Sequence, residues 1–204
     1  MTSQVVLEVY TDGACSSNGF KGARAGIGVH WPHDSTRDLS LPVEGAKQSN
    51  NVAELQALGA AFDAIAKHWD ADALLHGDPR YVVHSDSMYS LKALTEWLPS
   101  WLKKGRTDVQ NLELIMSVAD KLRVACPATD PGRVTLKHVY GHRDCAGNNR
   151  ADALARAASS AGPACASPLQ EPLTRVAKKI KEPRTSKRES FGARKRPRVS
   201  LGKE

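Results

Sequence analysis

The sequence predicts a mixed α/β domain over residues 1–162, followed by a basic tail over residues 163–204. Three features support this fold class: closely spaced strand-like segments near the amino terminus, a helical apolar period after residue 50, and later strand-like segments separated by helical ones. Strands joined by short connections pair antiparallel, whereas strands joined through helices are usually parallel. We therefore expect one sheet that contains both kinds of pairing.

The first three segments are strand-like because they are rich in β-branched residues or alternate apolar and polar positions. They read "VVLEVYTD" (5–12), "AGIGVHW" (25–31) and "DLSLPVEG" (38–45). Their short spacing predicts an antiparallel meander.

The apolar period then changes to that of an amphipathic helix over residues 51–69, where large apolar residues recur three or four positions apart. These residues are Leu55, Leu58, Phe62 and Ile65. The remaining predicted elements are a strand at 81–86, helical segments at 87–98 and 108–124, a strand at 134–141 and a last helix at 149–160.

Charge separates the domain from the tail. Residues 1–162 carry 17 Lys and Arg against 18 Asp and Glu, whereas residues 163–204 carry 12 against 4, a net charge of +8. With five prolines and few large apolar residues, the tail lacks the means to offset its ordering entropy by burial, so we expect disorder and polyanion binding. Within it, "ARKRPR" (193–198) is a candidate nuclear-import signal, and a solubilising tail is the alternative.

Composition also limits the cellular setting. The sequence has no apolar run of about 18 residues and no charged-then-apolar leader, so we expect neither a membrane span nor secretion. The four cysteines (Cys15, Cys126, Cys145 and Cys165) form no CxxC pair, which indicates reduced thiols in an intracellular protein, nuclear or otherwise cytoplasmic.

Four carboxylates have both a structural and a functional interpretation. Asp12 and Asp86 end predicted strands, where α/β sheets place ligands, but Asp12 could shape a turn and Asp86 could cap the next helix. Glu54 fits a capping box that begins at Asn51, and Asp152 lies in the first turn of its predicted helix, where the helix dipole favours an acid.

The four together favour function, because two strand ends and two helix beginnings can meet at one edge of a sheet. Clustered carboxylates repel one another unless a divalent cation neutralises them, and oxygen ligands suit Mg²⁺. Two ions about 3.5–4 Å apart can activate water and stabilise the leaving oxygen of a phosphoryl displacement. We therefore expect two Mg²⁺ ions per site.

Four motifs together resemble those of type 1 ribonuclease H over residues 5–160: "YTDGACSSNG", "SNNVAEL", "HSDSMYSL" and "VYGHRDCAGNNRADALA". The resemblance places the family's four carboxylates on Asp12, Glu54, Asp86 and Asp152, and its mobile histidine on His142. It implies a five-stranded sheet with helices on both faces. It also implies Mg²⁺- or Mn²⁺-dependent cleavage of the RNA strand of RNA–DNA hybrids.

The resemblance also implies contacts with the hybrid. Gly13 and Ala14 would let the backbone approach the RNA sugar, whose 2′-hydroxyl distinguishes RNA from DNA, and Asn18 would reach the minor groove. The family's segment before the catalytic Glu corresponds to Lys47, Ser49, Asn50 and Asn51.

The family's pocket for a DNA phosphate would combine Lys47, Ser49 and Asn111. Trp97 and Trp101 resemble its aromatic and basic protrusion, and packing of both rings against the core is the alternative. The stretch between Lys104 and Asn111 is shorter than in members with a long protrusion.

The sequence therefore predicts a monomeric, metal-dependent endonuclease that acts on RNA–DNA hybrids and has no membrane partner. Two alternatives stay open at this level. One is a non-catalytic hybrid-binding module, and the other is a DNA-acting nuclease or strand transferase of the same fold.

Overall fold

The computed structural model describes residues 4–141 and 145–161. In chain order, their main elements are β1 (Val6–Ser16), β2 (Arg24–His30), β3 (Leu39–Pro42), α1 (Asn50–His76), β4 (Arg80–Ser85), α2 (Met88–Lys92), a π-helical turn (Ala93–Trp97), α3 (Leu98–Lys103), α4 (Leu112–Ala125), β5 (Val134–His138) and α5 (Ala146–Ser160). The predicted order of elements is confirmed. No helix in these ranges is long and apolar enough to cross a membrane.

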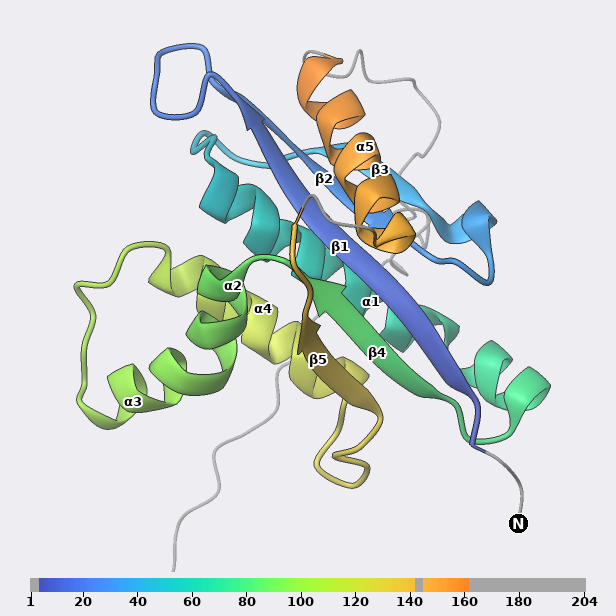
Figure 1. Ribbon diagram of the computed structural model, residues 1–204. Helices are drawn as coiled ribbons and strands as arrows, with labels where there is room; N and C mark the ends of the chain where they lie inside the picture. The colour runs from blue at the N-terminus through green and yellow to red at the C-terminus, as the bar shows by residue number, and fades with distance from the viewer. Residues whose placement is uncertain (1–3, 142–144, 162–204) are drawn as a thin grey trace, which may run out of the picture. The chain divides into compact units, whose positions relative to one another are not determined.

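The strands form one sheet in the order β3-β2-β1-β4-β5 (Figure 1). β1 pairs antiparallel with β2, and β2 pairs antiparallel with β3, which confirms the predicted meander. β4 lies parallel to both β1 and β5. The expected mixture of pairings within one sheet is therefore confirmed.

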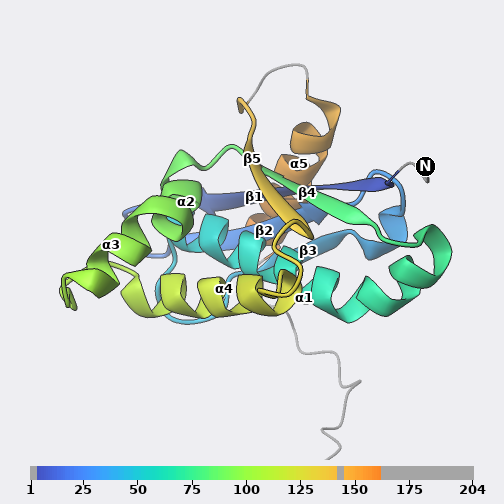
Figure 2. The ribbon, with the colours of Figure 1, turned by 90° about the horizontal axis from the view of Figure 1, so that it is seen from below.

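Helices cover both faces of this sheet. Figure 2 shows α5 on one face and α1 with α4 on the other. The core lies between the sheet and α1, where the side chains of Leu55, Leu58, Phe62 and Ile65 are fully buried together with Trp31 and Tyr81. Burial of each such side chain contributes about 1.5–3 kcal/mol, so the predicted apolar stripe holds α1 against the sheet.

The bounds of α1 follow from its two caps. Ser49 is the residue before the first turn, and its Oγ accepts a hydrogen bond from the backbone N–H of Val52 at 3.4 Å. Gly77, with φ +81°, ends the helix and donates its N–H to the carbonyl of Ala73. The helix is therefore longer at its carboxyl end than the predicted range of 51–69.

Other bounds also differ from the prediction, and three of the differences have a clear cause or affect the site. α4 begins at Leu112 rather than at residue 108, because Asn111 adopts a left-handed conformation with φ +62° that a helix interior cannot accept. β5 ends at His138, since its pairing with β4 stops where β4 stops, at Ser85. α5 begins at Ala146, three residues before the predicted start.

α5 packs unusually close to the backbone of β2. A Cβ atom placed on Gly28 would overlap the carbonyl oxygen of Ala151 and lie 2.7 Å from the backbone nitrogen of Ala155. Gly26 meets the same helix one turn later, near Ala158 and Ser159. Glycines on β2 and small residues on α5 therefore allow the short packing distance between this helix and the sheet.

Candidate metal centre

Asp12 lies inside β1 rather than at its end, which corrects the predicted strand boundary. β1 continues to Ser16 because residues 10–16 keep their pairing with β2. The parallel pairing of β1 with β4 nevertheless stops at Thr11 and Ser85, so Asp12 and Asp86 each follow the last residue of that pairing. The interpretation of Asp12 as a turn residue is wrong, and its convergence with Asp86 is confirmed.

Glu54 reaches this point because α1 packs tightly on β1. A Cβ atom on Gly13 would overlap the backbone nitrogen of Glu54 and lie 2.5 Å from the carbonyl carbon of Ala53. The helix begins after Ser49, so Glu54 is its fifth residue and the capping-box interpretation is wrong. The absent side chain of Gly13 is required for this packing, and its predicted contact with an RNA sugar stays a prediction.

The three acids form one cluster. One carboxylate oxygen each from Asp12, Glu54 and Asp86 lies within 4.8 Å of the other two. The first two residues are each only 5% exposed. Gly13 donates its N–H to Asp12 Oδ1 at 2.8 Å, whereas Glu54 Oε2 is buried with no hydrogen-bond partner among the described residues. This arrangement leaves negative charge that the described protein groups do not neutralise.

Burial and mutual repulsion change the proton affinity of these groups. Burial, followed by the charges of Asp86 and Asp152, raises the pKa of Asp12 to about 7. Burial, followed by the charges of Asp12 and Asp86, raises the pKa of Glu54 well above its usual range. A bound divalent cation would oppose both shifts, because it favours the ionised forms.

Asp152 lies on the wall of the same cavity. It is the seventh residue of α5, so the predicted placement in the first turn is wrong, because the helix already begins at Ala146. The cavity measures about 660 Å³ and is also lined by Asp12, Glu54 and Asp86. Asp152 stays outside the group of three, and its Oδ1 accepts a hydrogen bond from Arg156 Nε at 2.8 Å.

Two polar residues that contact the acids of this cavity were not predicted from the sequence. Asn148 is buried, and its Nδ2 donates to Asp86 Oδ2 at 3.4 Å. Arg156 contacts Asp152 from the next turn of α5. The signal for both was present, since Asn148, Asp152 and Arg156 are four residues apart and share one helix face. Asp86 itself does not cap α2, because Ser87 does so through a hydrogen bond from the backbone N–H of Ser90.

The predicted histidine, His142, lies outside the described residues, as does the tail over 163–204 with Cys165. The last described residue before His142 is Gly141, where a Cβ atom would lie 2.5 Å from Asp86 Oδ2. The role of His142 stays a prediction. The three described cysteines (Cys15, Cys126 and Cys145) are free thiols.

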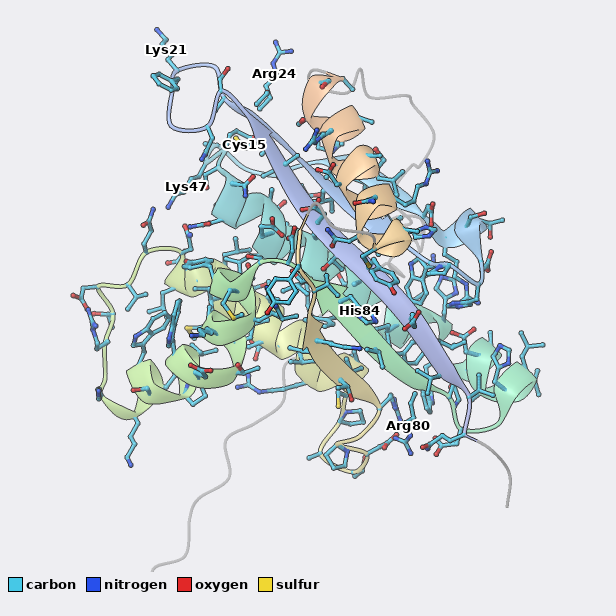
Figure 3. All side chains as sticks on the ribbon, in the orientation of Figure 1. Cys15, Lys21, Arg24, Lys47, Arg80 and His84 are labelled. Carbon is cyan, nitrogen blue, oxygen red and sulfur yellow. The ribbon has the colours of Figure 1, made fainter. Side chains whose placement is uncertain are left out.

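The predicted phosphate pocket is partly assembled. Lys47 Nζ donates to Asn111 Oδ1 at 2.6 Å, and Asn111 Nδ2 donates to the hydroxyl of Tyr89 at 3.3 Å. The third predicted member, Ser49, uses its hydroxyl to cap α1. Figure 3 shows Lys47 near the end of the sheet where Lys21 and Arg24 extend from the β1–β2 hairpin.

Only some of the other predicted contacts line the same cavity. Ala14 and Asn50 line it, and Asn18 Oδ1 accepts a hydrogen bond from the backbone N–H of Asn50 at 3.3 Å. Asn51 is exposed on the first turn of α1. Their contacts with nucleic acid stay predictions.

Trp97 and Trp101 form one aromatic group with Tyr89. The ring centroids of the two tryptophans are 5.9 Å apart, and those of Trp97 and Tyr89 are 5.8 Å apart. Both tryptophans are half-buried and pack against the main core, so part of each ring stabilises the fold while the rest stays accessible.

The raised pKa values predict that the metal-free domain loses stability as the pH rises from 6.5 to 8. In the unfolded chain Asp12 and Glu54 are ionised over this range, whereas the folded state holds their protons until higher pH. His33, His68 and His84, whose pKa values are lowered chiefly by burial, are neutral in both states at the upper end of the range. We expect the Tm in EDTA to fall by about 5 °C.

Thermal unfolding of the wild type and of Asp12→Asn checks this expectation. The variant should show a smaller fall because it lacks one of the two titrating acids. A wild-type Tm that rises with pH, or an equal fall in the variant, would contradict the assignment of buried, repelling carboxylates.

Comparison with known proteins gives a consistent result. A sequence model of the family described as RNase H matches residues 4–160. The chain is 39% identical over 157 residues to a Ribonuclease H of Schizosaccharomyces pombe, covering 74% of this chain and 52% of that protein. It is 38% identical to the rat Ribonuclease H1, with coverage of 72% and 48%. The chain thus spans about half the length of these two relatives.

A bacterial relative is matched over most of its length. The chain is 33% identical to a Ribonuclease H of Cyanothece, covering 74% of this chain and 88% of that protein. Two solved structures share the fold: the PFV RNase H domain (24% identity, TM-score 0.54, coverage 76% and 95%) and LC11-RNase H1 in complex with RNA/DNA hybrid (22% identity, TM-score 0.51, coverage 75% and 96%).

Proposed function

The chain belongs to the RNase H family, and from this premise we propose that its domain is a divalent-metal-dependent endonuclease that hydrolyses the RNA strand of RNA–DNA hybrids. The observation that carries the proposal is the group of buried Asp12, buried Glu54 and half-buried Asp86, with Asp152 on the wall of the same cavity. The names of the relatives support the reaction, and the hybrid bound to LC11-RNase H1 is consistent with the substrate class.

The donor set fits two Mg²⁺ or Mn²⁺ ions held by the four carboxylates. All of the donors are hard oxygens, and Glu54 Oε2 is buried without a partner among the described groups, as expected of a ligand atom whose cation is absent. Bound ions would supply an activated water and neutralise charge on the leaving oxygen. The second ion is part of the proposal, because Asp152 lies outside the group of three.

The chain's own groups hold these ligands and shape the substrate site. The Gly13 N–H fixes one oxygen of Asp12, and Asn148 fixes one oxygen of Asp86. Ala14 lines the cavity with a small side chain, which leaves room for a ribose and its 2′-hydroxyl. Histidine is the residue type best suited to exchange a proton near neutral pH, so His142 would carry a proton or assist product release.

We also propose that the Lys47–Asn111 pair holds a phosphate of the DNA strand. Lys47→Ala should then weaken hybrid affinity by about tenfold, equivalent to about 1.4 kcal/mol. It should lower the magnitude of the log–log salt slope by about 0.9, the value for one phosphate contact. Fluorescence anisotropy of a labelled hybrid in Ca²⁺ measures both quantities.

Lys67→Ala is the matched control, since Lys67 is exposed on α1 away from the cavity-lining residues. Unchanged affinity and salt slope in Lys47→Ala, or equal losses in the two variants, would contradict the phosphate assignment.

A substrate panel tests the proposed reaction against its two alternatives. Labelled hybrid, duplex RNA and duplex DNA should be incubated with the protein and Mg²⁺, and only the RNA strand of the hybrid should be cut. Binding of the hybrid without cleavage would favour a non-catalytic module. Cleavage of duplex DNA but not of the hybrid would favour a DNA-acting nuclease.

A further inference from the structure

Arg156 is the only cation among the described residues that line the acidic cavity. Its Nε donates to Asp152 Oδ1 at 2.8 Å, from one turn further along α5. The other three acids of the cavity have no comparable ion pair with a described residue. The guanidinium of Arg156 therefore pairs with Asp152, the one acid of the cavity that does not belong to the group of Asp12, Glu54 and Asp86.

The pair is placed where it can be exchanged for a metal ion. The side chain of Arg156 is 61% exposed, and that of Asp152 is 25% exposed. Exposed pairs of this kind are weak, because water screens them and two long side chains must be held in one geometry. A divalent cation carries twice the charge and needs no ordered side chain, so it can displace the guanidinium.

We propose that Arg156 is a positioning residue that acts as an internal counter-ion of Asp152 and competes with a divalent cation for this carboxylate. The inference rests on the proposed function in that it takes the cavity to bind divalent cations. In the metal-free protein Arg156 reduces the repulsion within the cavity. The more weakly bound of the two divalent cations must displace the Arg156 guanidinium from Asp152. Arg156 therefore sets the cation concentration at which Asp152 becomes a metal ligand.

Isothermal titration of Mn²⁺ into the nucleic-acid-free protein tests this competition without relying on activity. Arg156→Gln should lower the concentration that half-saturates the weaker site by about threefold to tenfold, because it removes both the competitor and a repelling charge. Arg156→Lys keeps the charge and should stay near the wild type. In an Asp152→Asn background, Arg156→Gln should have a much smaller effect on Mn²⁺ binding, because the carboxylate for which the two cations compete is gone.

Arg150→Gln is the matched control. Arg150 lies on the same helix, is 55% exposed and pairs with Asp38 at 3.4 Å, outside the cavity lining. Unchanged or weaker Mn²⁺ binding in Arg156→Gln would overturn the inference, as would equal tightening in Arg150→Gln, which would indicate only a change in net charge. A wild-type protein that binds no Mn²⁺ would instead overturn the proposed metal centre itself.

Discussion

Asp86→Asn is expected to abolish cleavage of the RNA strand while the domain stays folded and still binds the hybrid. A carboxylate oxygen of half-buried Asp86 lies within 4.8 Å of the acids Asp12 and Glu54, and an amide at this position changes a ligand without adding bulk. An amide carries no charge and is a poor ligand for two cations at once. We expect the single-turnover rate to fall by at least about 1000-fold, equivalent to about 4 kcal/mol of activation free energy.

Asp120→Asn is the control for this variant, because Asp120 is exposed on α4 and pairs only with Arg123 among the described residues. Its rate should equal that of the wild type. Removal of one repelling acid should also raise the Tm of metal-free Asp86→Asn, which excludes unfolding as the cause of lost activity. A rate within tenfold of the wild type would contradict the role of Asp86 as a metal ligand.

Gly28→Ala should be among the most destabilising single substitutions in the domain. The added Cβ would overlap backbone atoms of Ala151 and Ala155, and neither can move without displacing α5. We expect a loss of at least about 3 kcal/mol of unfolding free energy, which lowers the Tm by about 6–12 °C in a domain of this size. Because α5 carries Asp152, Mn²⁺ affinity should also fall.

Gly59→Ala provides the contrast. A Cβ at Gly59 would meet only side-chain atoms of Val118 and Lys121 at 3.4 Å, within the interior of α1. Alanine favours the helix by about 1 kcal/mol over glycine, so this variant should be as stable as the wild type or more so. Calorimetry compares the two variants, and a Gly28→Ala Tm within 2 °C of the wild type would contradict the close packing of α5 on β2.

The fold was predictable from the sequence where local pattern and tertiary packing agree. The stripe from Leu55 to Ile65 predicts the helix and the face that it buries. The extension of β1 through Gly13 to Ser16 could not be predicted locally, because these small and polar residues are typical of a turn. Their strand conformation depends on pairing with β2, which follows them in the chain.

The sequence predicted which acids form the site better than it predicted how they are positioned. Topology indicated that Asp12 and Asp86 would converge, since both follow neighbouring parallel strand segments. The position of Glu54 depends on which residue caps α1, and Ser49 caps it instead of the predicted Asn51. The pairing of Asp152 with Arg156 depends on the rotation of α5 over the sheet, which the start at Ala146 sets.

The most direct test of the metal-dependent RNA-strand cleavage proposed for this domain is product mapping on a duplex whose labelled strand contains a short RNA stretch within DNA, paired with a DNA strand. With Mg²⁺, cuts should occur only between ribonucleotides and should leave 5′-phosphate and 3′-hydroxyl ends, and EDTA should abolish them. Cuts in the flanking DNA, cuts that persist in EDTA, or an intact strand despite bound duplex and Mg²⁺ would contradict the account.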